Sequence, residues 1–189
     1  MRNMSHQVSK FENPTRLAEL NPKETLRRIG LSEYDVVCDI GAGSGIFTIP
    51  AAQLTSNSVF ALDINDEFLE IIKGKANDEE LPNIKPMKVA GDHYNYDIEV
   101  NSVDLVIMVT VFHEIADKEP LFTELRRILK SSGKLAIIEF HQRQTPMGPP
   151  VSHRIGREQV IELGKVKSFG ISDEFDLGDN FYCIVLQKD

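Results

Sequence analysis

Val36-Val37-Cys38-Asp39-Ile40-Gly41-Ala42-Gly43-Ser44-Gly45 decides the fold of this 189-residue chain. An apolar run ends in an acid, three glycines follow at alternate positions, and the residues from Ile46 to Leu54 have helical spacing. This order predicts a buried strand, a tight turn and a helix N-terminus, the unit that opens a doubly wound α/β domain. Pro50 lies beyond the first turn of the expected helix and predicts a kink there.

The glycines give this turn its binding chemistry. Without Cβ atoms they allow positive φ angles and let a ligand lie directly against the backbone, where free N–H groups of the helix start point outward. A Gly-x-Gly-x-Gly pattern also occurs in plain tight turns and in other nucleotide sites. We assign cofactor binding in this turn to Gly41, Ala42, Gly43 and Gly45.

An acid stands directly before the glycines. Asp39 ends the strand close to where the pyrophosphate of a dinucleotide would lie, and two like charges would repel each other there. A ligand that carries an ammonium beside a carboxylate suits the position better, with its amine facing Asp39 and its carboxylate near the helix N-terminus. The methionine end of S-adenosylmethionine has this chemistry.

A second acid ends the next apolar run, Val59 to Asp63. Asp63 falls about where the ribose-binding acid follows a glycine loop, and a carboxylate can accept hydrogen bonds from both ribose hydroxyls. The alternative is that Asp63 caps the following helix. Asn65 or Asp66 could equally supply that cap.

Further periodic segments predict the remaining elements of an α/β domain. We expect residues 130–134 to end the helix over 120–129, and Gly178-Asp179-Asn180 to form the turn of a C-terminal hairpin. The expected helices are 66–76, 120–129 and 156–165, and the expected strands are 84–89, 103–109, 135–140, 172–177 and 181–186.

The order of these stretches resembles that of class I S-adenosylmethionine-dependent methyltransferases, of the small single-domain kind grouped with ubiquinone/menaquinone and arsenite methyltransferase-like proteins. The resemblance covers roughly residues 30–140. It implies a Rossmann-like, three-layer α/β/α fold with a seven-stranded, mostly parallel sheet and an antiparallel C-terminal hairpin. The matching stretches are Val36 to Ala52, Val59 to Asn65, Val89 to His93, Val103 to Ile115 and Leu129 to Phe140.

The resemblance also implies the remaining cofactor contacts. Asp92, at the end of the third strand, is expected to bind the exocyclic amine of adenine. The alternative is a turn-forming Gly-Asp pair with a solvated side chain. The cofactor-binding set is completed by Ile64, Asn65, Phe68, Gly91, His93, Val109 and Thr110.

The segment after the fourth strand carries the candidate acid–base residues. Open α/β sheets bind ligands at the carboxyl ends of their strands, so this segment faces the methyl group if the fold is as expected. His113 is the candidate general base, because its ordinary pKa of about 6.5 lets it accept a proton from a hydroxyl, thiol or amine. Glu114 could orient it or serve instead. The alternative is that His113 caps the next helix or bonds a backbone carbonyl.

A loop rich in proline and basic residues follows the fifth strand, over 141–154. Proline and glycine fix an extended path over the sheet edge, so His141, His153 and Arg154 are predicted to converge on the substrate beside His113. The alternative is a plain crossover to the next helix, with Arg154 paired to a surface acid.

The residues before the first strand form a candidate lid, residues 1–30, ahead of a methyltransferase domain over 31–189. Residues 1–12 are polar and expected to be mobile, whereas the apolar spacing of 14–29, interrupted by Asn21-Pro22, predicts two short helices. In similar enzymes this region folds over the cofactor or substrate. The candidate lid contacts are Phe11, Asn13 and Arg16.

Composition favours small-molecule chemistry. The chain is 41% hydrophobic, which suits one compact domain, and its net charge of −8 argues against a general nucleic-acid or anionic-membrane surface. We see no signal peptide and no apolar stretch of the ~20 residues that cross a bilayer, so we expect a cytoplasmic protein, as a monomer or homodimer. Cys38 and Cys183 are expected as reduced core thiols, too few for arsenite chemistry, and no metal is expected.

The sequence therefore predicts an S-adenosylmethionine-dependent methyltransferase that acts on a small-molecule acceptor by in-line displacement. One alternative is a nicotinamide-dependent oxidoreductase, which Asp39 and the closing hairpin both disfavour. The other is a non-catalytic S-adenosylmethionine-binding partner protein, which would keep every cofactor residue and lack an acceptor pocket.

Overall fold

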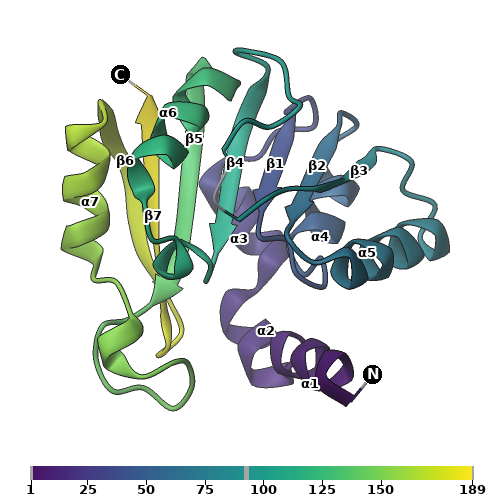
Figure 1. The fold of residues 1–189 in the computed structure, drawn as a ribbon, viewed down its shortest axis with the longest axis horizontal. Helices are drawn as coiled ribbons and strands as arrows, with labels where there is room; N and C mark the ends of the chain where they lie inside the picture. Colours follow the sequence, from purple (N-terminus) through teal and green to yellow (C-terminus); the bar gives the residue numbers. More distant parts are fainter. Residues whose placement is uncertain (1, 92–93, 189) are drawn as a thin grey trace.

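A seven-stranded sheet in the order β3-β2-β1-β4-β5-β7-β6 lies between two layers of helices (Figure 1). The computed structural model describes residues 2–91 and 94–188, with side chains from His6 onward. The strands are β1 (Val37–Ile40), β2 (Val59–Asp63), β3 (Ile84–Lys88), β4 (Val103–Val109), β5 (Leu129–Phe140), β6 (Phe169–Leu177) and β7 (Phe181–Lys188).

Helices connect β1 to β2, β2 to β3 and β4 to β5, as in a doubly wound domain. Within the described residues, no helix is long and apolar enough to cross a membrane. The α-helices are α1 (Arg2–Phe11), α2 (Pro14–Leu20), α3 (Pro22–Ile29), α4 (Thr48–Leu54), α5 (Asp66–Asp78), α6 (Lys118–Ile128) and α7 (Arg157–Val166), and the 3₁₀ turns are η1 (Phe112–Glu114) and η2 (Val151–His153).

The central strands are buried on both faces, which explains their unbroken apolar sequence. All four residues of β1 are buried, and β1 pairs in parallel with β2 and β4. β7 runs antiparallel between β5 and β6. The predicted three-layer fold, with its mostly parallel sheet and antiparallel C-terminal hairpin, is confirmed. Because β1, β2, β4 and β5 are parallel, their carboxyl ends meet at one edge of the sheet.

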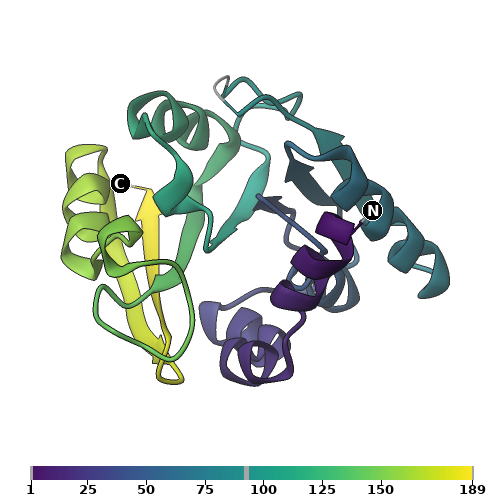
Figure 2. The same ribbon diagram turned by 60° about the horizontal axis from the view of Figure 1, so that its bottom comes forward.

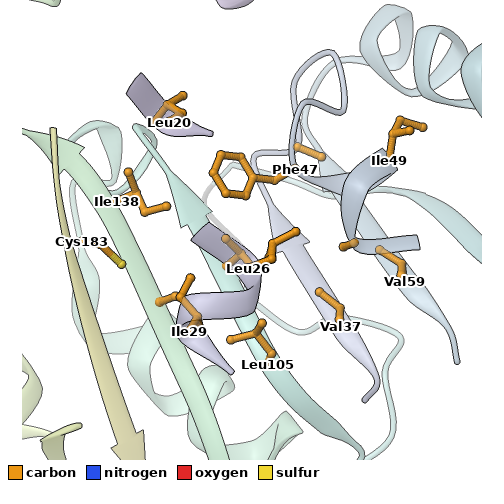
Figure 3. Close-up of a cluster of buried hydrophobic side chains, with 14 of the residues drawn as sticks. Leu20, Leu26, Ile29, Val37, Phe47, Ile49, Val59, Leu105, Ile138 and Cys183 are labelled. Carbon is orange, nitrogen blue, oxygen red and sulfur yellow. The ribbon is translucent and has the colours of Figure 1, made fainter. Parts of the chain in front are cut away.

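Two hydrophobic clusters fill the spaces between the sheet and its helices. Figure 3 shows the first, in which Leu26 and Ile29 of α3 and Phe47 before α4 pack against Val37 and Leu105 of the sheet. The second cluster joins the opposite face to α6 and to Val160 of α7. Both cysteines are free and fully buried, and burial raises the pKa of each thiol well above its ordinary value. They are structural thiols, as predicted.

The N-terminal segment contains three helices. Two of them, α2 and α3, are the pair predicted around Asn21-Pro22, and Asn13 caps α2 by accepting hydrogen bonds from the backbone N–H groups of Thr15 (3.0 Å) and Arg16 (3.3 Å). The third helix, α1, covers residues 2–11, in which the sequence predicted no helix of its own. Figures 1 and 2 place α1 and α2 beyond the carboxyl ends of the strands.

Two local expectations are wrong. Because α4 begins at Thr48, Pro50 lies in the first helical turn, where no N–H has a helical partner, and no kink is required. Residues 130–134 do not end a helix outside the sheet. They belong to β5, which starts where Leu129 pairs with Val103 and then shifts its register against β4 before Leu105.

A carboxylate on α2 ties this helix to the β6–β7 turn. Glu19 accepts hydrogen bonds from the Asn180 side-chain amide at 2.7 and 2.8 Å and from its backbone N–H at 3.1 Å. Asn180 is only 1% exposed, so these groups have no water to replace the carboxylate. The candidate lid segment is therefore fastened to the sheet at its second helix.

We predict that Glu19→Ala lowers the free energy of unfolding by about 1–3 kcal/mol, because it leaves a buried amide and a buried N–H without an acceptor. Urea unfolding followed by circular dichroism measures the change. Glu24→Ala is the matched control: its exposed carboxylate pairs with Arg27 on the same helix, and its loss should change stability by less than about 0.5 kcal/mol. Equal effects of the two substitutions would contradict a stabilising role for the Glu19–Asn180 hydrogen bonds.

Candidate functional site

A cavity of about 420 Å³ opens at the carboxyl edge of the sheet. It is lined by the ends of β1, β2 and β4, by the glycine turn, by the segment after β3 and by residues of α1 and α2. Its size lies within the range of ~300–1,000 Å³ that is usual for small-ligand sites. The predicted cofactor residues that line it are Asp39, Gly41, Ala42, Gly43, Asp63, Ile64, Asn65, Phe68, Gly91, Val109 and Thr110.

Three predicted residues of the cofactor set are not in this lining. Gly45 has a φ of 83°, and a Cβ there would lie 3.0 Å from Ile72, so this glycine allows α5 to pack against the turn. Asp92 and His93 lie outside the described residues.

The glycine turn is pressed against the end of β4. Gly41 has a φ of 71°, and a Cβ on it would lie 2.6 Å from the Val111 side chain. The turn is held to β2 because the N–H groups of Gly41 and Ala42 both donate to the Leu62 carbonyl, at 2.8 and 3.0 Å. The ring of Phe11 lies above Gly43. A ligand that enters the turn therefore meets backbone below and an aromatic ring of α1 above.

Asp63 connects the glycine turn to the end of β2. Its carboxylate oxygens accept hydrogen bonds from the N–H groups of Gly43 and Asn65, each at 2.8 Å. The helix cap is supplied by Asn65, which accepts from the Glu67 N–H, so the alternative that Asp63 caps α5 is wrong. Each carboxylate oxygen keeps a second lone pair that can accept a ligand hydroxyl.

Asp39 is the most perturbed carboxyl of the site. It is 2% exposed, and the Thr48 hydroxyl donates a hydrogen bond to its carboxylate at 2.6 Å. Burial, reinforced by the negative charge of Asp63, raises the pKa of Asp39 to about 7. A cationic group placed in the cavity beside Asp39 would stabilise the ionised carboxylate and reverse this shift.

Thr110 leaves β4 in a backbone conformation that is uncommon for a non-glycine residue, with a φ of 52°. Its N–H donates to the Ile138 carbonyl at 2.7 Å, and its hydroxyl accepts from the Arg16 guanidinium at 2.9 Å. Two strands and α2 thus fix the position of Thr110 at the edge of the cavity.

His113 is held by a buried acid that the sequence did not reveal. Its Nδ1 lies 2.8 and 3.0 Å from the two carboxylate oxygens of Glu139 at the end of β5, and its backbone N–H also donates to Glu139. This hydrogen bond raises the pKa of His113 above its ordinary value. Nε2 remains available, 3.9 Å from a carboxylate oxygen of Glu114. Glu139 makes shorter contacts with the ring than Glu114, and Asp117 supplies the cap of α6, so the alternative that His113 caps this helix is wrong.

Glu114 and His113 occupy different places relative to the cavity. Glu114 lines it with a largely exposed side chain, whereas His113 is not among the described lining residues and its side chain is 10% exposed. His113 is therefore adjacent in the chain to a residue of the cavity lining, and its Nε2 lies 3.9 Å from the carboxylate of that residue, Glu114.

The predicted convergence of His141, His153 and Arg154 beside His113 is not what the structure shows. His153 is exposed, and His141 lies beside Tyr182 with Asp176 at 3.6 Å; burial lowers its pKa. Arg154 is buried and makes five hydrogen bonds, to four carbonyls of the loop and the Thr145 hydroxyl. The guanidinium organises a loop whose prolines provide few N–H donors, and it does not pair with a surface acid.

Several cavity residues were missed or only suspected. Phe11 and Arg16, named as candidate lid contacts, do line the cavity, whereas Asn13 serves as the cap of α2. Tyr94 and Tyr96 line it from the irregular segment after β3, where the sequence has no periodic signal. Glu139 could have been suspected as a lone acid in an otherwise apolar strand.

Comparisons with known proteins agree with this geometry. Residues 38–137, more than half of the chain, match the methyltransferase domain family Methyltransf_11. The uncharacterized methyltransferase-like protein C25B8.10 of Schizosaccharomyces pombe is 30% identical over 128 residues, which are 67% of this chain and 47% of that protein. The ubiquinone/menaquinone biosynthesis C-methyltransferase UbiE of Marinomonas sp. is 22% identical over 147 residues, 76% of this chain and 58% of that enzyme. The chain spans about half the length of the curated relatives it matches.

Solved structures share the whole fold. The crystal structure of a SAM dependent methyltransferase from Aquifex aeolicus has a TM-score of 0.90 at 23% identity and covers 97% of this chain and 98% of its own. The phosphoethanolamine N-methyltransferase 2 of Haemonchus contortus, in complex with S-adenosyl-L-methionine, has a TM-score of 0.73 at 18% identity and covers 89% of this chain and 52% of its own. From the family match over residues 38–137, the chain belongs to the methyltransferase domain family, and it shares the fold of the SAM dependent methyltransferase from Aquifex aeolicus.

Proposed function

We propose that this protein transfers the methyl group of S-adenosylmethionine to a small-molecule acceptor by in-line displacement. One observation carries the proposal: two buried carboxylates, Asp39 and Asp63, face a single cavity from the ends of adjacent strands, on either side of a glycine turn. The cofactor needs one acid for its ammonium and one acceptor for its ribose hydroxyls, and this pair supplies both.

The described residues fit the cofactor. The Asp39 carboxyl, with its raised pKa, would gain a cationic partner in the ammonium of the methionine end. The lone pairs that Asp63 leaves free can accept the ribose hydroxyls, and the glycine turn leaves backbone open beneath the ligand. Phe68 and Tyr94 contribute aromatic rings to the lining of the same cavity.

When bound, S-adenosylmethionine supplies a methyl group already activated by its sulfonium. The protein then has to hold the acceptor in line with the bond that breaks and keep water away. The end of β4 lies beside β1 in the middle of the sheet and forms the cavity surface against which the acceptor would be held. Its residues in the cavity lining are Val109, Thr110 and Val111. Phe11 and Arg16 cover this point from the N-terminal helices.

His113 is proposed as the base that removes the proton of a hydroxyl, thiol or amine acceptor. Its Nδ1–H donates to the Glu139 carboxylate, which fixes the ring and leaves Nε2 as the proton acceptor. Glu139 is fully buried, so its negative charge stabilises the imidazolium that forms after proton transfer. Glu139 acts through His113 and is a positioning residue.

The cofactor site is tested first by ligand binding. S-Adenosylhomocysteine at ~100 times its dissociation constant should add about 2.7 kcal/mol to the free energy of unfolding, and NAD should add nothing. Asp63→Ala should remove the stabilisation, whereas Asp66→Ala, which loses an exposed carboxylate paired with Lys88, should retain it. Thermal unfolding with each ligand measures both effects. Stabilisation by NAD alone, or by neither ligand, would overturn the proposal.

Asp39→Asn should show that the cofactor acid is held at a cost to stability. The raised pKa means that the ionised carboxylate destabilises the folded state above pH ~7, and this effect disappears below the ordinary value of 3.8. Asparagine keeps an oxygen for the Thr48 hydroxyl, so we expect a gain of about 2 kcal/mol at pH 8 that shrinks as the pH falls toward 4. Urea unfolding across this range measures the gain, and S-adenosylhomocysteine binding should be lost. A gain that grows toward low pH would contradict the assignment.

The His113–Glu139 pair predicts a pH signature that needs no acceptor. An NMR titration of the His113 ring should give a pKa above 6.5 in the wild-type protein, and Glu139→Gln should lower it because the main stabilising hydrogen bond of the imidazolium is gone. Glu114→Gln, which removes the more distant carboxylate, should lower it less. An unchanged titration in Glu139→Gln would refute the pairing.

Once an acceptor with an exchangeable proton is found, His113→Asn should lower kcat by about 10²–10⁴-fold. Glu139→Gln should shift the rising limb of the kcat–pH profile to lower pH, which a purely structural role for Glu139 would not do.

A further inference from the structure

A buried arginine from the N-terminal segment reaches the cavity. Arg16 of α2 is 7% exposed, and it is the only lysine or arginine among the described residues that line the cavity. Its guanidinium lies 5.9, 5.8 and 5.3 Å from the ring centres of Phe11, Phe140 and Phe181. The planar cation is thus held in an aromatic frame at the β4–β5–β7 side of the sheet edge.

The guanidinium of Arg16 lacks the partners that a buried charge normally has. Its one hydrogen bond to the described residues is donated to the Thr110 hydroxyl at 2.9 Å, and its Nε is buried without a partner among them. Among the described residues no carboxylate forms an ion pair with the guanidinium. The negative charge of Glu139 acts to raise the pKa of Arg16, but the carboxylate of Glu139 is hydrogen-bonded to His113. Burial lowers the pKa of Arg16 to about 10, so the group stays charged at neutral pH.

A second buried arginine of the same chain, Arg154, has a guanidinium whose hydrogen-bonding groups are paired within the protein. Arg154 is also 7% exposed, yet it donates five hydrogen bonds to the loop around it. An unpaired buried cation is costly, and a buried N–H without an acceptor costs about 1–3 kcal/mol. Because Arg154 shows that the fold can satisfy a buried arginine with its own groups, the donors that Arg16 leaves free point to a ligand.

The position of Arg16 separates it from Asp39 and Asp63, the two acids proposed to hold the cofactor. Asp63 and Gly91 lie at the β2–β3 side of the cavity, and Asp39 lies at the end of β1. Thr110, Phe140 and Phe181, which contact Arg16, lie at the ends of β4, β5 and β7 on the other side. This is the half of the sheet edge that also carries His113 and Glu139.

We propose that Arg16 binds an anionic group of the methyl acceptor, a carboxylate or a phosphate, and so selects acceptors that carry one. The inference rests on the proposed function and names its substrate class. The guanidinium fork matches the two oxygens of such a group, and the aromatic frame favours a planar ligand beside it. S-Adenosylmethionine has a carboxylate of its own, so the test must separate the cofactor from the acceptor.

The probes are acetate, benzoate and inorganic phosphate, with neutral benzamide as the isostere of benzoate, each titrated calorimetrically into the full chain saturated with S-adenosylhomocysteine. At least one anion should bind the wild-type complex about tenfold more tightly than the Arg16→Gln complex, and benzamide should not distinguish the two. Arg16→Lys, which keeps the charge and loses the fork, should be intermediate. The control is Arg28→Gln, which removes a half-exposed arginine stacked on Phe175 outside the cavity lining and should behave as the wild type.

S-Adenosylhomocysteine and 5′-methylthioadenosine, which lacks the amino-acid end, are titrated into the same variants to identify the source of the anion. The proposal requires that Arg16→Gln bind S-adenosylhomocysteine and 5′-methylthioadenosine with affinities within about threefold of the wild-type values. A tenfold loss for S-adenosylhomocysteine alone would assign Arg16 to the cofactor carboxylate and overturn the proposal. It is also overturned if no anion prefers the wild-type protein. A wild-type protein that binds neither adenosyl ligand refutes the proposed function itself, which is a different outcome.

Discussion

The site depends on how closely the turn after β1 approaches the end of β4. At Gly41 there is no room for a side chain, since a Cβ would lie 2.6 Å from Val111. This close approach brings the acid of β1, the open backbone of the glycine turn and the residues after β4 to one cavity. The bond from the Gly43 N–H to Asp63 fixes the same turn from the β2 side. A larger residue at Gly41 would separate the two strand ends and with them the proposed cofactor and acceptor halves of the site.

The parts of the fold that the sequence predicts are those carried by local signals. Apolar runs ended by acids predicted the central strands, and the glycine turn with Asp39 and Asp63 at the ends of two such runs predicted part of the cavity lining, because each of these signals lies within a short stretch of chain. Pairs that form only in the folded chain could not be predicted in this way. Arg16 and Thr110 are 94 positions apart, and His113 and Glu139 are 26 apart.

The loop over 141–154 shows why composition alone misplaces functional residues. Basic side chains beside prolines suggested a substrate contact, but a proline-rich loop has unsatisfied carbonyls of its own, and Arg154 satisfies them. A sequence does not distinguish an arginine that completes a loop from one that waits for a ligand. The two arginines differ in how many of their N–H donors are hydrogen-bonded to other groups of the protein. This difference can be seen only in the folded structure.

The place of β7 in the sheet bears on how the chain folds as it is made. β7 follows every other strand in sequence, yet it is inserted between β5 and β6 and is buried along most of its length. A nascent chain that has not yet released β7 from the ribosome therefore exposes the unpaired edge of β5 and lacks the Asn180 turn to which α2 is fastened. Completion of the sheet and the docking of α2 therefore follow the emergence of β7, and shortening β7 would disturb a cavity that none of its residues lines.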